Sequence, residues 1–294
     1  MTEILIYNGL INGFVVGGIY ALIGLSLTLL YGVLRIVNFA HGEFVIGGAF
    51  VAYVLFNSMG IMPLLALPIA AVLFFGLGWA AYYLLIPRLM RSDDPEVMSF
   101  LLMYGVSIAL AALMLLIFEA DSRSIDYSFE PISLKVGVIY VSTARLVAFA
   151  ITILLSAALA GFLFFTLPGK ALRATIMNRE AIQIVGVDID KLSALAFALA
   201  SAIAGVTGVL VALVFPAFNP FVGAEYTIIG FIVVVLGGLG NPVGALLAGI
   251  LYGLAEQMST VFLPQAMAQI VGFVILVAVI LIRPSGLLGW RALR

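Results

Sequence analysis

The chain has 294 residues, of which 65% are hydrophobic and only 9% are charged. A typical soluble domain is about 45–50% apolar and about 25% charged, so the composition excludes an ordinary soluble protein. The formal net charge of −1 provides no basic surface for a nucleic-acid partner. The absence of cysteine excludes disulfides, and a single histidine leaves little room for a metal site. The composition therefore predicts an all-α polytopic membrane protein.

Hydrophobic segments between the few charges are long enough for membrane spans of about 20 residues each. The first lies between Glu3 and Arg35. The next, between Glu43 and Arg88, is 44 residues long and holds two spans separated by a turn at 57–60. Single spans are predicted at 97–118, 146–167 and 192–215.

The last hydrophobic stretch covers residues 226–282 and is interrupted by one charge, Glu256. Helix-breaking residues stand at 237–242 and at Pro264. The stretch therefore holds either two long spans or three short ones.

Charge distribution indicates the orientation. Ten of the thirteen basic residues are Arg35 or lie in the segments 88–91, 168–191 and 283–294, which are therefore predicted to be cytoplasmic. The acidic loop 119–140 is predicted to lie outside. A cytoplasmic end after residue 282 requires an odd number of crossings after 215. The prediction is nine spans with the N-terminus outside, or eight if one segment is re-entrant.

The nine segments divide into four spans, one span and four spans, within a single transmembrane domain at 1–294. A four-helix unit repeated after one connecting helix returns inverted, as in many transporters. Direct similarity between the halves is faint and limited to 10–25 and 192–210, so the inverted repeat is a hypothesis.

Small residues one helical turn apart permit close approach of helices. Gly13 and Gly17 form one such pair, and Gly249 and Gly253 form another. Both pairs favour helix packing within one subunit, with a seam to a second subunit as the alternative.

The segment 35–44 concentrates polar residues between two apolar stretches. Polar side chains within a membrane usually face a bundle interior or an aqueous path. Two interpretations remain open: a network that fixes helix geometry, with Glu43 paired to Arg35 or His41, or a lining of the solute path. In the second, Gly42 breaks the backbone and leaves amide groups free for a polar solute. The candidate path residues are Asn38, His41, Gly42, Glu43 and the intramembrane Glu256.

Residues 215–225 contain two prolines and Asn219, which predict a stiff, non-helical external connection. This connection is either a plain rigid loop or a docking element for an external partner. Glu256 likewise is either a hydrogen-bonded buried carboxyl or a residue of the solute path. No nucleophile and base stand together in the sequence, so no catalytic residue and no metal ligand are predicted.

The cytoplasmic loop 168–191 has mixed polarity, and its apolar residues recur at roughly helical spacing. Asn178 or Asp190 is suited to cap a short helix there. Such a helix either lies on the membrane surface or docks its apolar face on a soluble partner.

This loop carries a resemblance to a known family. Glu180 and Ala181, followed by Gly186, look like the Glu-Ala-Ala…Gly loop of ABC importer permeases, with Ile182 in place of the second alanine. Further motifs are Asn-Phe-Ala-His-Gly at 38–42, Asn-Arg-Glu-Ala at 178–181 and Gly-Gly-Leu-Gly-Asn-Pro at 237–242. Over nearly its full length the chain resembles the branched-chain amino-acid ABC permeases of the LivH type.

The resemblance implies an importer complex in the bacterial inner membrane. The chain is then a multi-pass permease that pairs with a second related permease, two cytoplasmic ATPases and a periplasmic substrate-binding protein. Residues Asn178, Arg179, Glu180, Ala181 and Gly186 are then the candidates for coupling to the ATPases. The chain contains no phosphate-binding loop of the Gly-x4-Gly-Lys-Ser/Thr type, so we expect the partner ATPases, rather than this chain, to use ATP.

Alternative functions remain. Related permeases of similar sequence serve urea or short amides, so the amino-acid substrate rests on the resemblance alone. An ion-coupled secondary transporter usually has several intramembrane carboxylates or an unwound helix, and this chain offers only Glu43 and Glu256.

Overall fold

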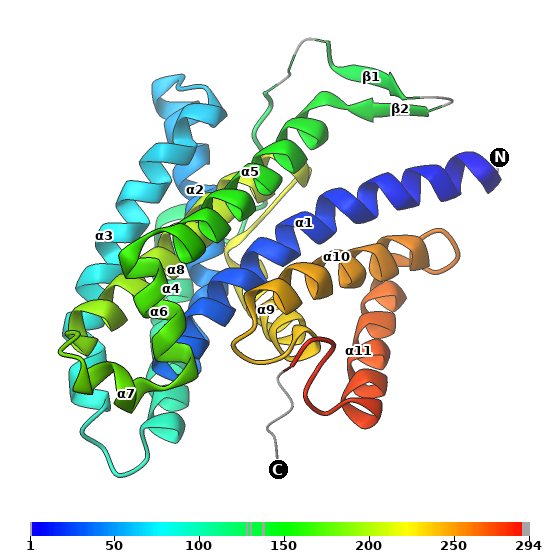
Figure 1. Cartoon of the computed structure of the whole chain (residues 1–294). Helices are drawn as coiled ribbons and strands as arrows, with labels where there is room; N and C mark the ends of the chain where they lie inside the picture. Colours follow the sequence, from blue (N-terminus) through cyan, green and yellow to red (C-terminus); the bar gives the residue numbers. More distant parts are fainter. Residues whose placement is uncertain (1, 128, 130, 137–138, 290–294) are drawn as a thin grey trace.

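The computed structural model describes residues 2–127, 129, 131–136 and 139–289. These residues form a helical bundle with one short hairpin (Figure 1). The first half contains α1 (Thr2–Leu34), α2 (His41–Met59), α3 (Pro63–Leu89), α4 (Pro95–Phe118), β1 (Ser133–Val136), β2 (Ile139–Ser142) and α5 (Thr143–Phe165). The second contains α6 (Leu167–Met177), α7 (Arg179–Ile184), α8 (Ile189–Val214), the 3-10 turn η1 (Pro220–Val222), α9 (Gly223–Gly237), α10 (Pro242–Ser259) and α11 (Gln265–Ile282).

The predicted helix boundaries are confirmed where breaking residues define them. After α2, Gly60 adopts a left-handed conformation with a φ of 67°, which glycine adopts without steric cost. Pro63 then occupies the first turn of α3, where its missing N–H has no consequence. The segment 237–242 separates α9 from α10, and Pro264 precedes α11. The last hydrophobic stretch therefore forms three helices rather than two.

Within the part of the chain that the structure describes, seven helices are long and apolar enough to cross a membrane, namely α1, α2, α3, α4, α5, α8 and the continuous helical segment Pro220–Gly237. The protein is thus polytopic and helical, whereas the predicted count of nine spans is not confirmed. The two further helices α10 and α11 fall in the predicted hydrophobic stretch. A hairpin pairs Ser133 with Ser142 in the loop before α5, where the sequence predicted only an acidic connection. Figure 1 places this hairpin and α6–α7 at opposite ends of α5.

The helices α1 and α8 form the centre of the bundle. They have the largest buried shares among the candidate spans, 94% and 78% of their most apolar windows, against 22% or less for α3, α4 and α5. The most extensive packing joins α1 to α10, and the next joins α8 to α3. Each central helix therefore packs along a helix from the other half of the chain.

Glycines make the α1–α10 contact close. A Cβ atom on Gly253 would lie 2.3 Å from the Cα of Gly17, and one on Gly13 would lie 2.9 Å from the Cα of Leu254. A Cβ on Gly249 would lie 2.3 Å from the Cα of Ala21. These distances are too short for any side chain, so the two glycine pairs pack against one another within this subunit, as the sequence favoured.

Candidate functional site

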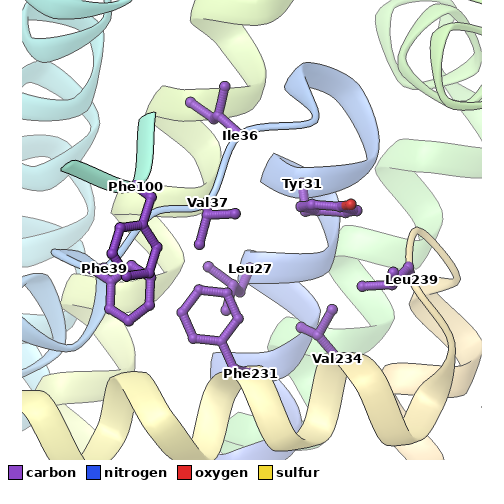
Figure 2. Close-up of a pocket in the computed structure, with 9 residues that line it drawn as sticks. All are labelled: Leu27, Tyr31, Ile36, Val37, Phe39, Phe100, Phe231, Val234 and Leu239. Atoms are coloured by element: carbon purple, nitrogen blue, oxygen red, sulfur yellow. The ribbon is translucent and has the colours of Figure 1, made fainter. Parts of the chain in front are cut away.

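The polar segment after α1 turns back into the bundle. Arg35 has a φ of 54°, in the left-handed region, and its amide donates to the carbonyl of Tyr31. Residues 36–40 then run beside α1 without helical structure (Figure 2). The helix α2 begins at His41, whose Nε2 lies 2.8 Å from the hydroxyl of Ser26 on α1. Ser26 is eight residues before the end of α1, or about 12 Å along the helix. The start of α2 therefore lies inside the bundle.

Asn38 and His41 are fully buried at this start. The Oδ1 of Asn38 accepts a hydrogen bond from the amide of Ala40 at 3.0 Å, which forms an Asx turn. The hydroxyl of Ser26 donates to the carbonyl of Ile23, so the Nε2 of His41 is the donor to Ser26. Within the described residues the Nδ2 of Asn38 and the Nδ1 of His41 have no hydrogen-bond partner.

Gly42 has a different role from the predicted one. Its amide is not free, because it donates to the hydroxyl of Thr227 on α9 at 2.8 Å. A Cβ at this position would lie 1.8 Å from the carbonyl oxygen of Gly223. Gly42 is therefore required for the close crossing of α2 and α9, and the prediction of a backbone break at this residue is wrong.

Glu43 is nearly fully buried, with 4% of its surface exposed. Its predicted pairing with Arg35 or His41 is wrong: Oε1 accepts from the hydroxyl of Ser107 on α4 at 3.3 Å, and Arg35 is exposed. The Oε2 has no partner among the described residues and packs against Gly223. The Glu43 carboxyl therefore has one oxygen hydrogen-bonded to α4 and one buried oxygen without a partner in the described part of the chain.

The start of α9 repeats the local features of the start of α2. Asn219 forms an Asx turn with the amide of Phe221, as Asn38 does with Ala40. Both helices lack a side-chain cap, and both have glutamate as their third residue, Glu43 in α2 and Glu225 in α9. Glu225 thus lies in a helix, not in the non-helical connection predicted for 215–225. The two helix starts, each with a partial positive charge, lie against one another inside the bundle, where Thr227 accepts from the Gly42 amide of α2 and Asn219 caps the turn η1 that leads into α9.

Glu256 lies elsewhere, on α10, with 1% of its surface exposed. Its carboxyl is next to the hydroxyl of Tyr20 on α1, and the ring of Tyr20 is 5.6 Å from that of Tyr252. Among the described residues no hydrogen bond joins Glu256 to the cluster at the start of α2, so the structure does not bring the five candidate path residues into one site.

The loop 168–191, predicted to be cytoplasmic, contains α7 and most of α6. Asn178 caps α7, as predicted, by accepting from the amide of Ala181 at 3.0 Å. Asp190 does not serve as a cap. Instead Asp188 caps α8 through the amide of Lys191 at 3.1 Å, and this hydrogen bond lowers the pKa of the Asp188 carboxyl below its ordinary value.

No residue of α7 is buried. Glu180, Ala181 and Gly186 are exposed, and Gly186 ends the segment with a φ of 81°. The neighbouring apolar side chains Ile184 and Val185 are 86% and 72% exposed. The segment therefore presents both polar and apolar side chains to the outside of the bundle.

Two contacts connect this segment to the spans. The guanidinium of Arg179 donates to the carbonyl of Val33, in the last turn of α1, at 3.4 Å. The side chain of Ile176 lies between Gly32 on α1 and Gly240 in the α9–α10 connection. One contact comes from α7 and the other from α6, and both reach the last turn of α1, which precedes the polar segment 35–44.

Comparison with known proteins identifies the family. Residues 9–280 match the family described as the branched-chain amino acid transport system/permease component. The chain belongs to this family. It is 29% identical to the high-affinity branched-chain amino acid transport system permease protein BraD of Pseudomonas aeruginosa, with 98% of each chain covered.

Two archaeal relatives add to this. The chain is 30% identical to the probable branched-chain amino acid transport permease protein LivH of Methanocaldococcus jannaschii, covering 93% of this chain and 90% of that protein. It is also 29% identical to the probable permease protein LivM of the same organism, over 41% and 39% of the two chains. No solved structure gives a significant match. The protein is therefore a multi-pass permease component of the inner membrane, a membrane subunit rather than a catalytic one.

Sequence reasoning missed the partners of the polar segment, above all Ser107 and Thr227. Both lie in apolar helices, and neither has a motif around it. A signal was nevertheless present: the pairs Asn38–Glu43 and Asn219–Glu225 have nearly equal spacing, which marks two related helix starts.

Proposed function

We propose that this permease is the translocation subunit of an ATP-driven ABC importer that moves branched-chain amino acids into the cytoplasm. The substrate class is taken from the relatives, which are named as branched-chain amino acid transport permeases. The partners are a second, related permease, two cytoplasmic ATPases that use ATP, and a periplasmic substrate-binding protein. The occurrence of LivH-type and LivM-type relatives in one organism supports the paired permease.

The proposed membrane arrangement has nine spans in one domain, with eight as the alternative and the N-terminus outside. The packing supports an inverted repeat of α1–α4 and α8–α11 around α5. The contact of α1 with α10 corresponds to that of α8 with α3. Both pairs are antiparallel, since Gly13 and Gly17 face Leu254 and Ile250, while Phe74 and Gly78 face Gly205 and Ser201.

The observation that carries the proposal is the exposed helix α7 within the loop 168–191. An exposed, capped helix with unpartnered apolar side chains fits the cleft of a soluble partner. Asn178, Arg179, Glu180, Ala181 and Gly186 form this segment, which we assign to the ATPase contact. When the ATPases close, α7 moves and the contact of Arg179 with Val33 carries the displacement to α1.

The path for the solute passes the meeting point of α2 and α9. A branched-chain amino acid carries a carboxylate, an ammonium group and an apolar side chain. The partial positive charge of the two helix N-termini favours the carboxylate, and the unpartnered Oε2 of Glu43 suits the ammonium group. Asn38, His41 and Gly42 shape this point, and Glu256 belongs to a second polar position on the path.

Replacement of the coupling residues tests the proposal. In the assembled complex, Glu180→Ala together with Gly186→Val is expected to abolish co-purification of the ATPases and leucine uptake. The matched control is Glu119→Ala, an exposed glutamate at the far end of α4, which is expected to leave both unchanged. Normal assembly and normal transport-coupled ATP hydrolysis in the double variant contradict the assignment.

A second experiment separates path residues from structural ones. Uptake is measured for Asn38→Ala, His41→Ala and Glu43→Ala, with complex assembly measured independently. Loss of uptake with assembly retained supports the path, and normal uptake reduces these residues to structural ones. The same assay with urea or short amides tests the alternative substrates. Uptake without ATPases, driven by an ion gradient, is the result expected of a secondary transporter.

A further inference from the structure

A cavity of about 220 Å³ lies beside the polar segment. Figure 2 shows its walls. Leu27 and Tyr31 come from α1, Val37 and Phe39 from the extended segment, and Phe231 from α9. Further lining residues come from α4 and from the α9–α10 connection. The cavity is thus lined by elements that are far apart in the sequence.

The lining is apolar. Every lining side chain is a hydrocarbon except that of Tyr31, whose hydroxyl points toward Leu239 in Figure 2. Dry cavities of about 150 Å³ lined by such residues bind ligands the size of benzene. The volume here is larger and therefore sufficient for a four-carbon side chain.

The extended segment also supplies polar backbone groups next to this apolar space. The amide of Val37 donates to the hydroxyl of Ser99, and the carbonyl of Phe39 accepts from Thr227. Within the described part of the chain, no hydrogen bond engages the amides of Asn38 and Phe39 or the carbonyls of Ile36 and Val37. A zwitterion with an apolar side chain needs both kinds of surface.

The cavity lies near the meeting point of α2 and α9, because both share a contact with Thr227. The hydroxyl of Thr227 joins the two places, because it donates to the carbonyl of Phe39 and accepts from the amide of Gly42. At its other end the cavity reaches Leu239 in the α9–α10 connection. In this connection Gly240 lies against the side chain of Ile176 on α6. The cavity therefore lies between the polar cluster and the cytoplasmic helices.

We propose that this cavity receives the apolar side chain of a branched-chain amino acid on its way from the α2–α9 meeting point to the cytoplasm. The proposal rests on the proposed function and extends it to a specificity-determining site. Val37 and Phe231 set the size of the side chain that passes. The other possible occupants are a lipid chain and a side chain of the partner permease, and the test distinguishes both from an amino-acid side chain.

The absence of cysteine from the chain permits a direct test of occupancy. Val37→Cys is assembled with cysteine-free partner subunits and alkylated with a small maleimide in the presence of leucine or glycine. Leucine at about ten times its dissociation constant is expected to slow alkylation by about tenfold, whereas glycine leaves the rate unchanged. The control Val243→Cys lies at the start of α10, outside the cavity lining, and is expected to react equally in both.

Transport selectivity gives an independent readout. One methylene group in a hydrophobic pocket changes discrimination by about 10-fold or more. The substitution Val37→Phe is therefore expected to lower leucine uptake relative to valine uptake by about tenfold, with the binding protein saturated in each case. Conversely, Phe231→Ala is expected to raise phenylalanine uptake relative to leucine uptake.

The outcomes distinguish this proposal from the function on which it rests. If the wild-type complex takes up no branched-chain amino acid, the proposed function fails. A different set of results overturns only the cavity assignment. In that case the complex transports leucine, but the thiol of the Val37→Cys variant is alkylated at the same rate in leucine as in glycine. Both selectivity variants then change the uptake rates of all amino acids by the same factor. If that thiol is protected from alkylation to the same extent in leucine, in glycine and without either, a lipid chain or a side chain of the partner permease occupies the cavity. This result also overturns the cavity assignment.

Discussion

The hydroxyl of Thr227 holds the starts of α2 and α9 together, so its removal is the sharpest test of the site geometry. The residue is 2% exposed. It accepts from the amide of Gly42 at 2.8 Å and donates to the carbonyl of Phe39 at 3.0 Å. In Thr227→Val the side chain keeps its shape, but the amide of Gly42 loses its acceptor and the carbonyl of Phe39 loses its donor.

The magnitude follows from these two groups. A buried polar group left without a partner costs about 1–3 kcal/mol, whereas hydrogen bonds between membrane helices are worth about 0.6–1.7 kcal/mol. We therefore expect Thr227→Val to lower the free energy of unfolding by about 2 kcal/mol, a value within the range that these two estimates span. For a chain of this size, each kcal/mol corresponds to roughly 2–4 °C in Tm, so the expected decrease is roughly 4–8 °C.

The assay is thermal unfolding of the purified complex in detergent, with uptake measured in parallel. The matched control is Thr207→Val on α8, because among the described residues the Thr207 hydroxyl bonds only to the carbonyl of Ile203 within its own helix. This carbonyl keeps its helical partner, so the control is expected to change Tm little. Equal Tm values for the two variants would refute the assignment of Thr227 as the connection between α2 and α9.

Three further predictions concern packing and coupling. Gly249→Ala places a Cβ 2.3 Å from the Cα of Ala21 and is expected to lower Tm. In the control Gly76→Ala the added Cβ meets no described atom within 4 Å, so Tm is expected to stay unchanged or rise. A thermal scan in which the control is the less stable variant contradicts the α1–α10 contact. Asn178→Ala removes the cap of α7 at a cost of about 1 kcal/mol, so ATPase binding in a pull-down titration is expected to weaken about fivefold, and undiminished binding argues against a preformed α7. Arg179→Met removes the bond to α1 and is expected to reduce uptake per ATP hydrolysed while assembly persists; an unchanged ratio shows that this contact transmits nothing.

The sequence predicted the parts of the fold that local rules determine. Glycine marked the ends of α2 and α9, and proline the start of α10, because their backbone preferences act within a few residues. The glycine pairs of α1 and α10 predicted a close helix contact because spacing alone brings small residues to one face.

The site was predicted only in part, because its partners are distant in sequence. Asn38, His41 and Glu43 were singled out correctly as buried polar residues of one cluster. Their partners were not, since Ser107 is 64 residues from Glu43 and Thr227 is 185 residues from Gly42. The expected pairing of Glu43 with Arg35 failed because the chain reverses at Arg35, which leaves the guanidinium at the end of α1 while Glu43 returns into the bundle.

The related starts of α2 and α9 show why a motif alone does not define a site. Glu43 and Glu225 occupy the same position in their helices, yet Glu43 is buried against Ser107 and Glu225 is exposed beside Tyr252 and Gln269. The surroundings differ because Ser107 of α4 contacts the buried Glu43, whereas Glu225 lies in a surface pocket beside Gln269 of α11. Equivalent positions thus give one enclosed carboxyl and one accessible carboxyl.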